Sequence, residues 1–334
     1  MSTTIYADAD ADPAALRERT IAVIGYGNQG AAQAQNIRDS GLDSVIVGNR
    51  DDEYRPRAAD AGFAVSGIPE AAGQGDVVLL LIPDEVQPEV FNADIAPHLR
   101  PGETLVVASG YNVAFGLLDV PDGADIVMVA PRMIGAAVRA RYLEGTGFPC
   151  MVSVERDATG GALRTALAVA RAIGGTRAGA IASSAREEAA LDLFSEQALW
   201  PAIMSVLRTG YEVLHEAGFS DEAVLYEMYL SGEAAEIFSR AAVQGLLGQL
   251  PLHSQTSQFG QLRGLLRIDP AGLRERFARV LHEDILSGEF AREWSAVSAD
   301  AGKRITELTA EAGRHPLSVS EQAVLRRARR GSAD

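Results

Sequence analysis

The sequence predicts an α/β domain built on a parallel sheet, followed by an all-α domain. Short β-branched runs alternate with helical segments in the first half of the chain, and few such runs remain afterwards. A glycine-rich loop, Gly25-x-Gly27-x-x-Gly30, joins the first of these runs to a helical segment. We therefore expect one domain over residues 1–182 and a second over residues 183–334.

The composition is that of an ordinary globular protein with an excess of acidic residues. Of its 334 residues, 47% are hydrophobic and 22% are charged, which supplies enough apolar material for two cores. The formal net charge of −15 disfavours binding to nucleic acid or to an anionic membrane surface. No apolar run is long enough to span a bilayer, and no signal-peptide pattern is recognisable. The single cysteine, Cys150, lies in an apolar run, so we expect a buried structural thiol and a cytoplasmic protein.

Six short apolar runs have the composition of buried strands. They lack the strict polar alternation of half-exposed strands, as expected for a parallel sheet that is covered on both faces. They cover residues 20–25, 44–48, 76–82, 104–108, 125–130 and 149–154. Helical segments lie between most of them, and the one over residues 31–40 directly follows the glycine loop.

The second half of the chain has helical spacing instead of strand patterns. Three segments carry this spacing, over residues 185–210, 221–248 and 270–286. With few β-branched runs among them, they predict an all-α domain.

The glycine loop has the spacing and position of a dinucleotide-binding site. Its first glycine permits a tight turn, the second leaves room for a pyrophosphate, and the third lets the helix pack closely on the strand. The N–H groups at the helix N-terminus then face the pyrophosphate, so we expect NADH or NADPH here rather than a turn without a ligand. The residues expected to contact the cofactor in this loop are Gly25, Tyr26, Gly27, Asn28, Gln29 and Gly30.

The residues after the second strand bear on the choice of cofactor. An acid at this position favours the free 2′-hydroxyl of NADH, and an arginine favours the 2′-phosphate of NADPH. This chain has both, because Arg50 is followed by Asp51, Asp52 and Glu53. The consecutive acids oppose a second dianion and therefore favour NADH, although the arginine leaves NADPH open.

Carboxylates in the helical half form a second candidate site. Asp192 and Glu196 are four residues apart, a spacing that places both on one face of a regular helix. Glu227 interrupts an otherwise apolar helical segment, where a carboxylate needs a partner. Clustered carboxylate oxygens suit Mg²⁺. Acids at this spacing also occur on solvated helix faces, so the spacing alone leaves both interpretations open.

Several stretches together resemble the ketol-acid reductoisomerase family in its short form, from about residue 4 to about residue 320. The matching stretches include the glycine loop and the acidic helix, and they cover residues 24–30, 142–149, 173–179, 192–197 and 287–294. The resemblance implies a Rossmann-type domain followed by a helical domain for metal binding, substrate binding and dimerisation. It also implies a homodimer or a larger homo-oligomer.

The resemblance implies a reaction in two steps. In this family two Mg²⁺ ions bind the substrate oxygens while an alkyl group migrates, and NADPH then reduces the resulting ketone. By position, Asp192, Glu196 and Glu227 match metal ligands, for one or two ions in this chain. Ser254 matches a serine that binds the substrate carboxylate, although an ordinary turn serine would have the same sequence.

Three positions depart from the family pattern in the substrate site. Ser109 stands where the family has a histidine, and Arg132 stands where it has the catalytic lysine. Ser231 stands where the family has a second glutamate, one turn after Glu227. Arginine suits a carboxylate but is a poor proton shuttle, and the loss of one carboxylate weakens a second Mg²⁺ site.

We therefore expect an NAD(P)H-dependent oxidoreductase of this family that acts on a small molecule. The departures favour hydride transfer to a small keto or imino substrate, with the isomerisation altered or lost. One alternative is an authentic Mg²⁺-dependent ketol-acid reductoisomerase of branched-chain amino-acid biosynthesis, and another is a non-catalytic cofactor-binding subunit. The expected catalytic residues are Arg132, Asp192, Glu196, Glu227 and Ser254.

Overall fold

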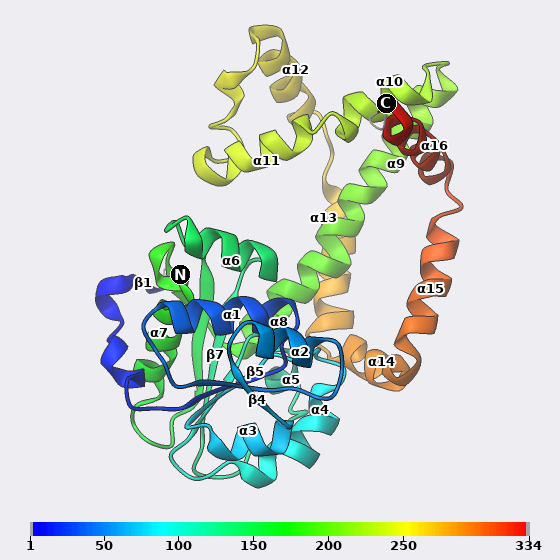
Figure 1. The fold of residues 1–334 in the computed structure, drawn as a ribbon. Helices are drawn as coiled ribbons and strands as arrows, with labels where there is room; N and C mark the ends of the chain where they lie inside the picture. The colour runs from blue at the N-terminus through cyan, green and yellow to red at the C-terminus, as the bar shows by residue number, and fades with distance from the viewer. Residues whose placement is uncertain (1–2, 332–334) are drawn as a thin grey trace. The chain divides into compact units, whose positions relative to one another are not determined.

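The structure is a computed structural model that describes residues 3–331 (Figure 1). The chain divides into two compact units, one ending at Asp192 and the other beginning at Leu193. The first unit is α/β, and the second contains helices and no strand within the described residues. The predicted fold class is therefore confirmed.

A nine-stranded sheet forms the centre of the first unit, in the order β1-β9-β8-β7-β6-β5-β2-β3-β4. The strands are β1 (Ile5–Tyr6), β2 (Ile21–Ile24), β3 (Val45–Gly48), β4 (Ala64–Ser66), β5 (Val77–Leu80), β6 (Thr104–Val107), β7 (Asp125–Pro131), β8 (Cys150–Arg156) and β9 (Ala180–Ala182). All six predicted strands are present. The sequence does not predict β1, β4 and β9, because strands of two or three residues are too short to carry a pattern.

The sheet is mostly parallel, but it departs from the predicted parallel arrangement at two strand pairs. β8 runs antiparallel to β7, and β1 runs antiparallel to β9. β2 pairs in parallel with both β3 and β5, so the strand order reverses at β2. Ligands of open parallel sheets bind outside the carboxyl ends of the strands at such a point, which here is the edge where the glycine loop lies.

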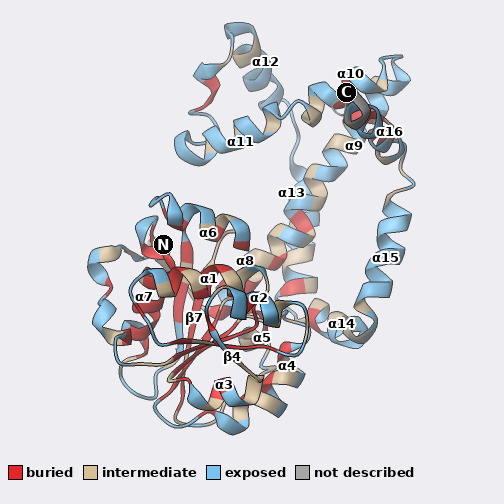
Figure 2. Ribbon diagram, in the orientation of Figure 1, coloured by how far each residue is buried: buried red, intermediate tan, exposed pale blue. Residues whose placement is uncertain are grey.

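Helices cover both faces of the sheet. Ile21 of β2 belongs to the same core as α1 and α7, whereas its neighbour Ala22 belongs to the core beneath α3. Figure 2 shows the buried residues concentrated in the strands. The helices of this unit are α1 (Asn28–Asp39), α2 (Tyr54–Asp60), α3 (Ile68–Gln74), α4 (Gln87–Val90), α5 (Tyr111–Ala114), α6 (Gly135–Leu143), α7 (Ala162–Ile173) and α8 (Ala185–Phe194), the last of which ends just beyond the unit boundary.

The second unit consists of helices around a small core. Its α-helices are α9 (Trp200–Glu216), α10 (Asp221–Leu225), α11 (Glu233–Gln244), α12 (Gln255–Leu265), α13 (Ala271–Arg279), α14 (Glu289–Val297), α15 (Ala301–Ala312) and α16 (Pro316–Gly331). The core cluster contains Tyr211, Val224, Leu225, Leu317 and Val324. Most other positions in α11 to α15 are exposed (Figure 2). None of the described helices is long and apolar enough to cross a membrane.

The three predicted helical segments are helical, but each contains a π-helical turn. These turns are η6 (Ser195–Leu199), η7 (Tyr226–Leu230) and η9 (Val280–Ile285). The segment over residues 221–248 also breaks at Gly232, whose φ of +86° is a left-handed conformation that favours glycine. Periodicity alone does not detect the π-helical turns, because a single wide turn barely shifts the apolar pattern. It does not locate the break at Gly232 either.

Candidate active site

The glycine loop makes a tight turn at the end of β2. Gly25 has a φ of +95°, in the left-handed region that favours glycine. A Cβ atom on Gly30 would lie 1.9 Å from the carbonyl oxygen of Gly25, so only glycine lets α1 start this close to the strand. A Cβ atom on Gly27 would meet nothing within 4 Å, so this glycine borders open space.

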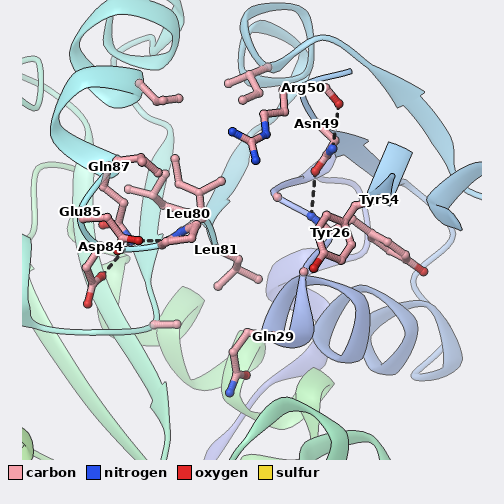
Figure 3. A pocket seen from close by; sticks show the side chains of 18 of the residues that line it. Tyr26, Gln29, Asn49, Arg50, Tyr54, Leu80, Leu81, Asp84, Glu85 and Gln87 are labelled. Atoms are coloured by element: carbon pink, nitrogen blue, oxygen red, sulfur yellow. Dashed lines mark hydrogen bonds between the residues drawn. The ribbon is translucent and has the colours of Figure 1, made fainter. Parts of the chain in front are cut away.

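A cavity of about 770 Å³ opens beside the glycine loop at the carboxyl edge of the sheet (Figure 3). Residues that follow β3, β5 and β6 line most of the rest of it, together with Ile68 of α3 and Leu80 of β5. Its volume lies in the range of small-molecule and cofactor sites. Most residues predicted to contact the cofactor line this cavity, namely Gly25, Tyr26, Gly27, Asn28, Gln29, Arg50 and Asp52. Gly30 and Asp51 do not line it.

Asp52 is held firmly at one side of the cavity. Its Oδ1 atom accepts hydrogen bonds from the Asn49 side chain at 2.8 Å and from the Tyr54 N–H at 2.9 Å. Its Oδ2 atom accepts from Arg50 Nε at 2.7 Å. The Arg50 hydrogen bond is the main cause that lowers the pKa of Asp52. Arg50, whose side chain is 79% exposed, therefore pairs with an acid of its own loop.

Asn49 is a site residue that the sequence does not single out. Its Oδ1 atom accepts a hydrogen bond from the Tyr26 N–H at 3.0 Å, as Figure 3 shows. The side chain thereby ties the glycine loop to the loop that carries Asp52. Its place directly after a strand is a weak signal, because the partner lies 23 residues earlier in the chain.

Asp84 lies across the cavity from Arg50 and Tyr54 in Figure 3. Its Oδ2 atom accepts a hydrogen bond from Ser109 Oγ at 3.2 Å, and its Oδ1 atom accepts one from Gln87 Nε2 at 3.0 Å. Burial raises the pKa of Asp84 to about 6. The hydrogen bond from Ser109 opposes this rise, and the nearby negative charges of Glu85 and Asp192 add to it. No pattern in the sequence marks Asp84 as a site residue.

Arg132 connects the end of β7 to two acids of α8. Its Nη1 atom donates to Glu188 Oε1 at 2.5 Å, and its Nη2 atom donates to Asp192. The other oxygen of Glu188 accepts from the Gly110 N–H at 2.7 Å. Burial raises the pKa of Glu188, which is only 2% exposed, while the Gly110 N–H and Arg132 oppose the rise. The sequence suggests that the Arg132 guanidinium could bind a substrate carboxylate. In this structure Glu188 and Asp192 occupy it instead.

The expected metal ligands of the helical unit lie in π-helical turns. Glu196 belongs to η6 and Glu227 to η7, and both residues are exposed. The apolar sequence around Glu227 does not bury this carboxylate in the single chain. Single π-helical turns inside α-helices are rare and occur frequently at functional sites.

Ser254 caps a helix in this structure. Its exposed side chain accepts a hydrogen bond from the Ser257 N–H at 3.2 Å at the start of α12. This contact is the one expected of an ordinary turn serine. Across the described residues, no group of three or more His, Cys, Asp or Glu side chains is gathered closely enough to hold a metal ion.

Cys150 is a buried thiol, as the sequence predicts. It is 0% exposed at the start of β8, and a Cβ atom on Gly175 would lie 2.6 Å from its Sγ atom. Burial raises the pKa of Cys150 to about 12. A thiol that stays protonated at neutral pH is inert, so its role is packing.

Comparisons with known proteins cover both halves of the chain. Residues 15–179 match the acetohydroxy acid isomeroreductase, NADPH-binding domain model, and residues 186–330 match the ketol-acid reductoisomerase, C-terminal domain model. The ketol-acid reductoisomerase (NADP(+)) of Pyrobaculum calidifontis is 40% identical over 94% of this chain and 95% of its own length. The corresponding protein of Methanopyrus kandleri is 44% identical over 87% of this chain and 88% of its own.

A solved structure agrees with these sequence matches. It is an NADH-preferring ketol-acid reductoisomerase from an uncultured archean, which is 33% identical to this chain. The two structures superpose with a TM-score of 0.88, and the match covers 97% of this chain and 98% of that one.

Proposed function

This chain belongs to the ketol-acid reductoisomerase family, and we propose that it catalyses the family reaction, the Mg²⁺-dependent rearrangement and reduction of a small acetohydroxy acid. The observation that carries this proposal is similarity over nearly the whole chain to enzymes named for that reaction. It supports the authentic isomeroreductase more than the altered reductase that Ser109 and Arg132 favour. The chain is thus an NAD(P)H-dependent oxidoreductase whose place would be branched-chain amino-acid biosynthesis.

The cavity beside the glycine loop fits a nicotinamide dinucleotide, which supplies the hydride when it is bound. Gly27 leaves open space where the N-terminus of α1 meets the cavity, and this is where a pyrophosphate is expected to lie. Gln29 keeps the loop in place, because its Nε2 atom donates to the Met133 carbonyl at 2.9 Å. Asp51 and Gly30 would act through the shape of their loops, since neither lines the cavity.

NADH is the preferred cofactor in this proposal. Asp52 presents a fixed carboxylate to the cavity, and Arg50, the cation suited to a 2′-phosphate, is paired with it. The relatives named above use NADP(+), whereas the solved neighbour prefers NADH. The family thus accommodates both cofactors, and the Arg50–Asp52 pair is the feature of this chain that favours NADH.

Magnesium would be held by Asp192, Glu196 and Glu227, and when bound it polarises the oxygens of the substrate. Their carboxylate oxygens suit this hard cation. Asp192 accepts a hydrogen bond from Arg132, so the metal and the guanidinium compete for the same carboxylate. Ser254 would bind the substrate carboxylate once its capping contact is shared or released.

The pairing of Arg132 with Asp192 favours a second candidate function. If the guanidinium keeps this carboxylate, Mg²⁺ binds weakly, and the chain reduces a small keto or imino acid without rearranging it. A spectrophotometric assay separates the two candidates. Oxidation of NADH or NADPH that requires both 2-acetolactate and Mg²⁺ supports the family reaction. Oxidation by simple 2-keto acids without Mg²⁺ supports the second candidate, and binding of cofactor without any turnover supports a non-catalytic subunit.

The helical unit is proposed to associate with a second copy of this chain. Its helices expose large apolar side chains, among them Val243 (86% exposed), Leu266 (85%) and Phe259 (68%). A second copy that covered these side chains would remove their apolar surface from water. Light scattering that gives the mass of a single chain would overturn this part of the proposal. The buried thiol of Cys150 is consistent with the reducing cytoplasm in which we place the protein.

A further inference from the structure

We propose that Ser109 and Asp84 form the proton relay of the reduction, in which Ser109 donates to the carbonyl oxygen of the substrate and Asp84 restores the serine proton. Both side chains line the cofactor cavity, beyond the ends of β5 and β6. The inference rests on the proposed function, because it requires a carbonyl substrate that accepts a hydride in this cavity.

The two carboxylate oxygens of Asp84 have different hydrogen-bond partners and therefore different roles. Gln87 Nε2 donates to Oδ1 at 3.0 Å and also to the Ile82 carbonyl at 2.8 Å, so this amide fixes the carboxyl group. Asn112 reinforces the arrangement, since its Nδ2 atom donates to Gln87 Oε1 at 2.9 Å and to the Asp84 carbonyl at 3.0 Å. The Oδ2 atom faces Ser109 Oγ at 3.2 Å, which makes the hydroxyl the group that can exchange a proton with it.

The position of Ser109 suits a donor to a ligand in the cavity. The Tyr111 N–H donates to Ser109 Oγ at 3.3 Å and so holds the hydroxyl oxygen from behind. A serine hydroxyl has a high pKa, and alone it cannot release a net proton near neutral pH. Next to a carboxylic acid it passes a proton on and recovers one at once.

The surroundings of Asp84 keep its carboxyl group protonated at unusually high pH. Glu85 of the same loop and Asp192 of α8 are the negative charges that act on it, and Tyr111 of α5 is a further titratable neighbour. With burial as the main cause, they raise the pKa of Asp84 from 3.8 to about 6. An acid with a pKa near the working pH is the kind that general acid catalysis needs.

The relay balances the reduction of a ketone or an imine. The hydride of NAD(P)H forms the new C–H bond, while the proton of Ser109 Oγ moves to the carbonyl oxygen or imine nitrogen. The Asp84 proton moves to Ser109 Oγ, which leaves an Asp84 carboxylate and NAD(P)⁺. Water then returns one proton to Asp84 before the next turnover.

Arg132 is a weaker candidate for this proton. A guanidinium stays charged at working pH, and the terminal nitrogens of Arg132 donate to Glu188 and Asp192. Ser109 is therefore the catalytic residue, and Asp84 acts through it. The dependence of the rate on pH tests this role, because the ionisation of an Asp84 that is only structural would not appear in the rate.

The test compares the purified full-length protein with the variants Asp84→Asn, Ser109→Ala and Asp119→Asn. Asp119→Asn is the matched control, because it makes the same change at an exposed residue that does not line the cavity and does not act on the pKa of Asp84. The rate constant kcat/KM is measured against pH with 2-acetolactate and Mg²⁺, and with pyruvate as a simple 2-keto acid. We expect the wild-type value to fall about tenfold for each pH unit above about 6.

The variants distinguish a relay from a structural role. Asp84→Asn and Ser109→Ala should each lose about 100-fold in kcat/KM at pH 6, and Asp84→Asn should also lose the fall above that pH. Asp119→Asn should keep the wild-type profile. NADH binding, followed by its fluorescence, should change less than about threefold in all three variants. An Asp84→Asn variant that keeps the wild-type pH profile would overturn the relay.

A second measurement separates failure of the relay from failure of the proposed function. The carbon-13 signal of the Asp84 carboxyl, identified by its absence in Asp84→Asn, is titrated with NADH bound. A midpoint near 6 supports the relay, and a midpoint near 4 overturns it even if the enzyme turns over. If the wild type oxidises no cofactor with either substrate although Asp84 titrates near 6, the proposed function has failed instead.

Discussion

Arg132 donates a hydrogen bond from Nη2 to Asp192, the carboxylate of α8 that we propose as a magnesium ligand. Arg132, which the sequence predicts to stand in place of the family lysine, is therefore tied to the expected metal site. In the proposed function, rearrangement of the substrate requires Mg²⁺, and not the guanidinium, to hold Asp192.

Replacing Arg132 by lysine should strengthen magnesium binding. A single ammonium group cannot hold Glu188 and Asp192 as the guanidinium fork does, so Asp192 becomes available to the metal. We expect the Mg²⁺ concentration for half-maximal activity with 2-acetolactate to fall about tenfold. Arg139→Lys is the control, because its ion pair with Asp39 lies elsewhere on this unit. An unchanged Mg²⁺ requirement in Arg132→Lys would contradict the competition.

Asp84→Asn should stabilise the protein at high pH and not at low pH. The folded-state pKa of Asp84 is about 6, above its unfolded value, so ionisation is disfavoured in the folded state. The contribution of Asp84 to the free energy of unfolding of the wild type is therefore complete below pH 3.8, and it is lost as the pH rises through 6. Urea unfolding should show a gain of about 2 kcal/mol for the variant at pH 8. An equal gain at pH 4 would show that charge is not the cause.

Asp52→Ser should shift the cofactor preference towards NADPH. The change removes the carboxylate that repels a 2′-phosphate and releases Arg50 to bind one. We expect the ratio of the NADPH and NADH dissociation constants to move by about tenfold in favour of NADPH. Asp51→Ser is the matched control, because Asp51 is adjacent but does not line the cavity. Equal shifts in both variants would mean that net charge alone sets the preference.

Alanine at Gly27 and at Gly30 should have opposite effects on folding and binding. A Cβ atom at Gly30 would clash with the carbonyl oxygen of Gly25, so Gly30→Ala should destabilise the first unit by about 3 kcal/mol. At Gly27 the space is open, so Gly27→Ala should unfold at the wild-type temperature. It should nevertheless weaken NADH binding at least about tenfold, since its methyl group enters the space expected for the pyrophosphate. Thermal melts and fluorescence titrations check the pair, and a destabilised Gly27→Ala would contradict it.

Cys150 should resist thiol reagents in the folded protein. Its thiol is buried, and burial raises its pKa to about 12, so the reactive thiolate is absent at pH 8. Ellman's reagent should detect no thiol in native protein and one thiol per chain in urea. Rapid labelling of the native protein would show that β8 opens easily.

The sequence predicts the parts of this molecule whose information is local. The six longer strands and the glycine loop each lie within a few consecutive residues, so composition and spacing predict them. Asn49, Asp84 and Glu188 act through partners 23 to 78 residues away, and no local pattern marks them. Asn49 and Asp84 are polar residues just beyond buried strands, and Glu188 lies inside the acidic helix. Polar residues at such positions are too common to single these three out.

The exposure of Glu227 could not be predicted from the sequence for a different reason. An apolar helical segment predicts burial, but it does not say whether the same chain or another molecule covers it. In the single chain Glu227 is exposed, together with Tyr226 beside it. The regular spacing of Asp192 and Glu196 is likewise interrupted by η6, because the apolar pattern does not report one wider turn.

The antiparallel pair of β1 and β9 has a consequence for handling the protein. Ile5 and Tyr6 occupy the hydrogen-bonding edge of β9, next to Ile181 and Ala180. A chain shortened past Tyr6 would leave that edge open as a template for strands of other molecules. Truncation or proteolysis at the N-terminus should therefore first appear as aggregation. The cofactor cavity should be lost only later, because it lies beyond the ends of β2, β3, β5 and β6, away from the β1 edge.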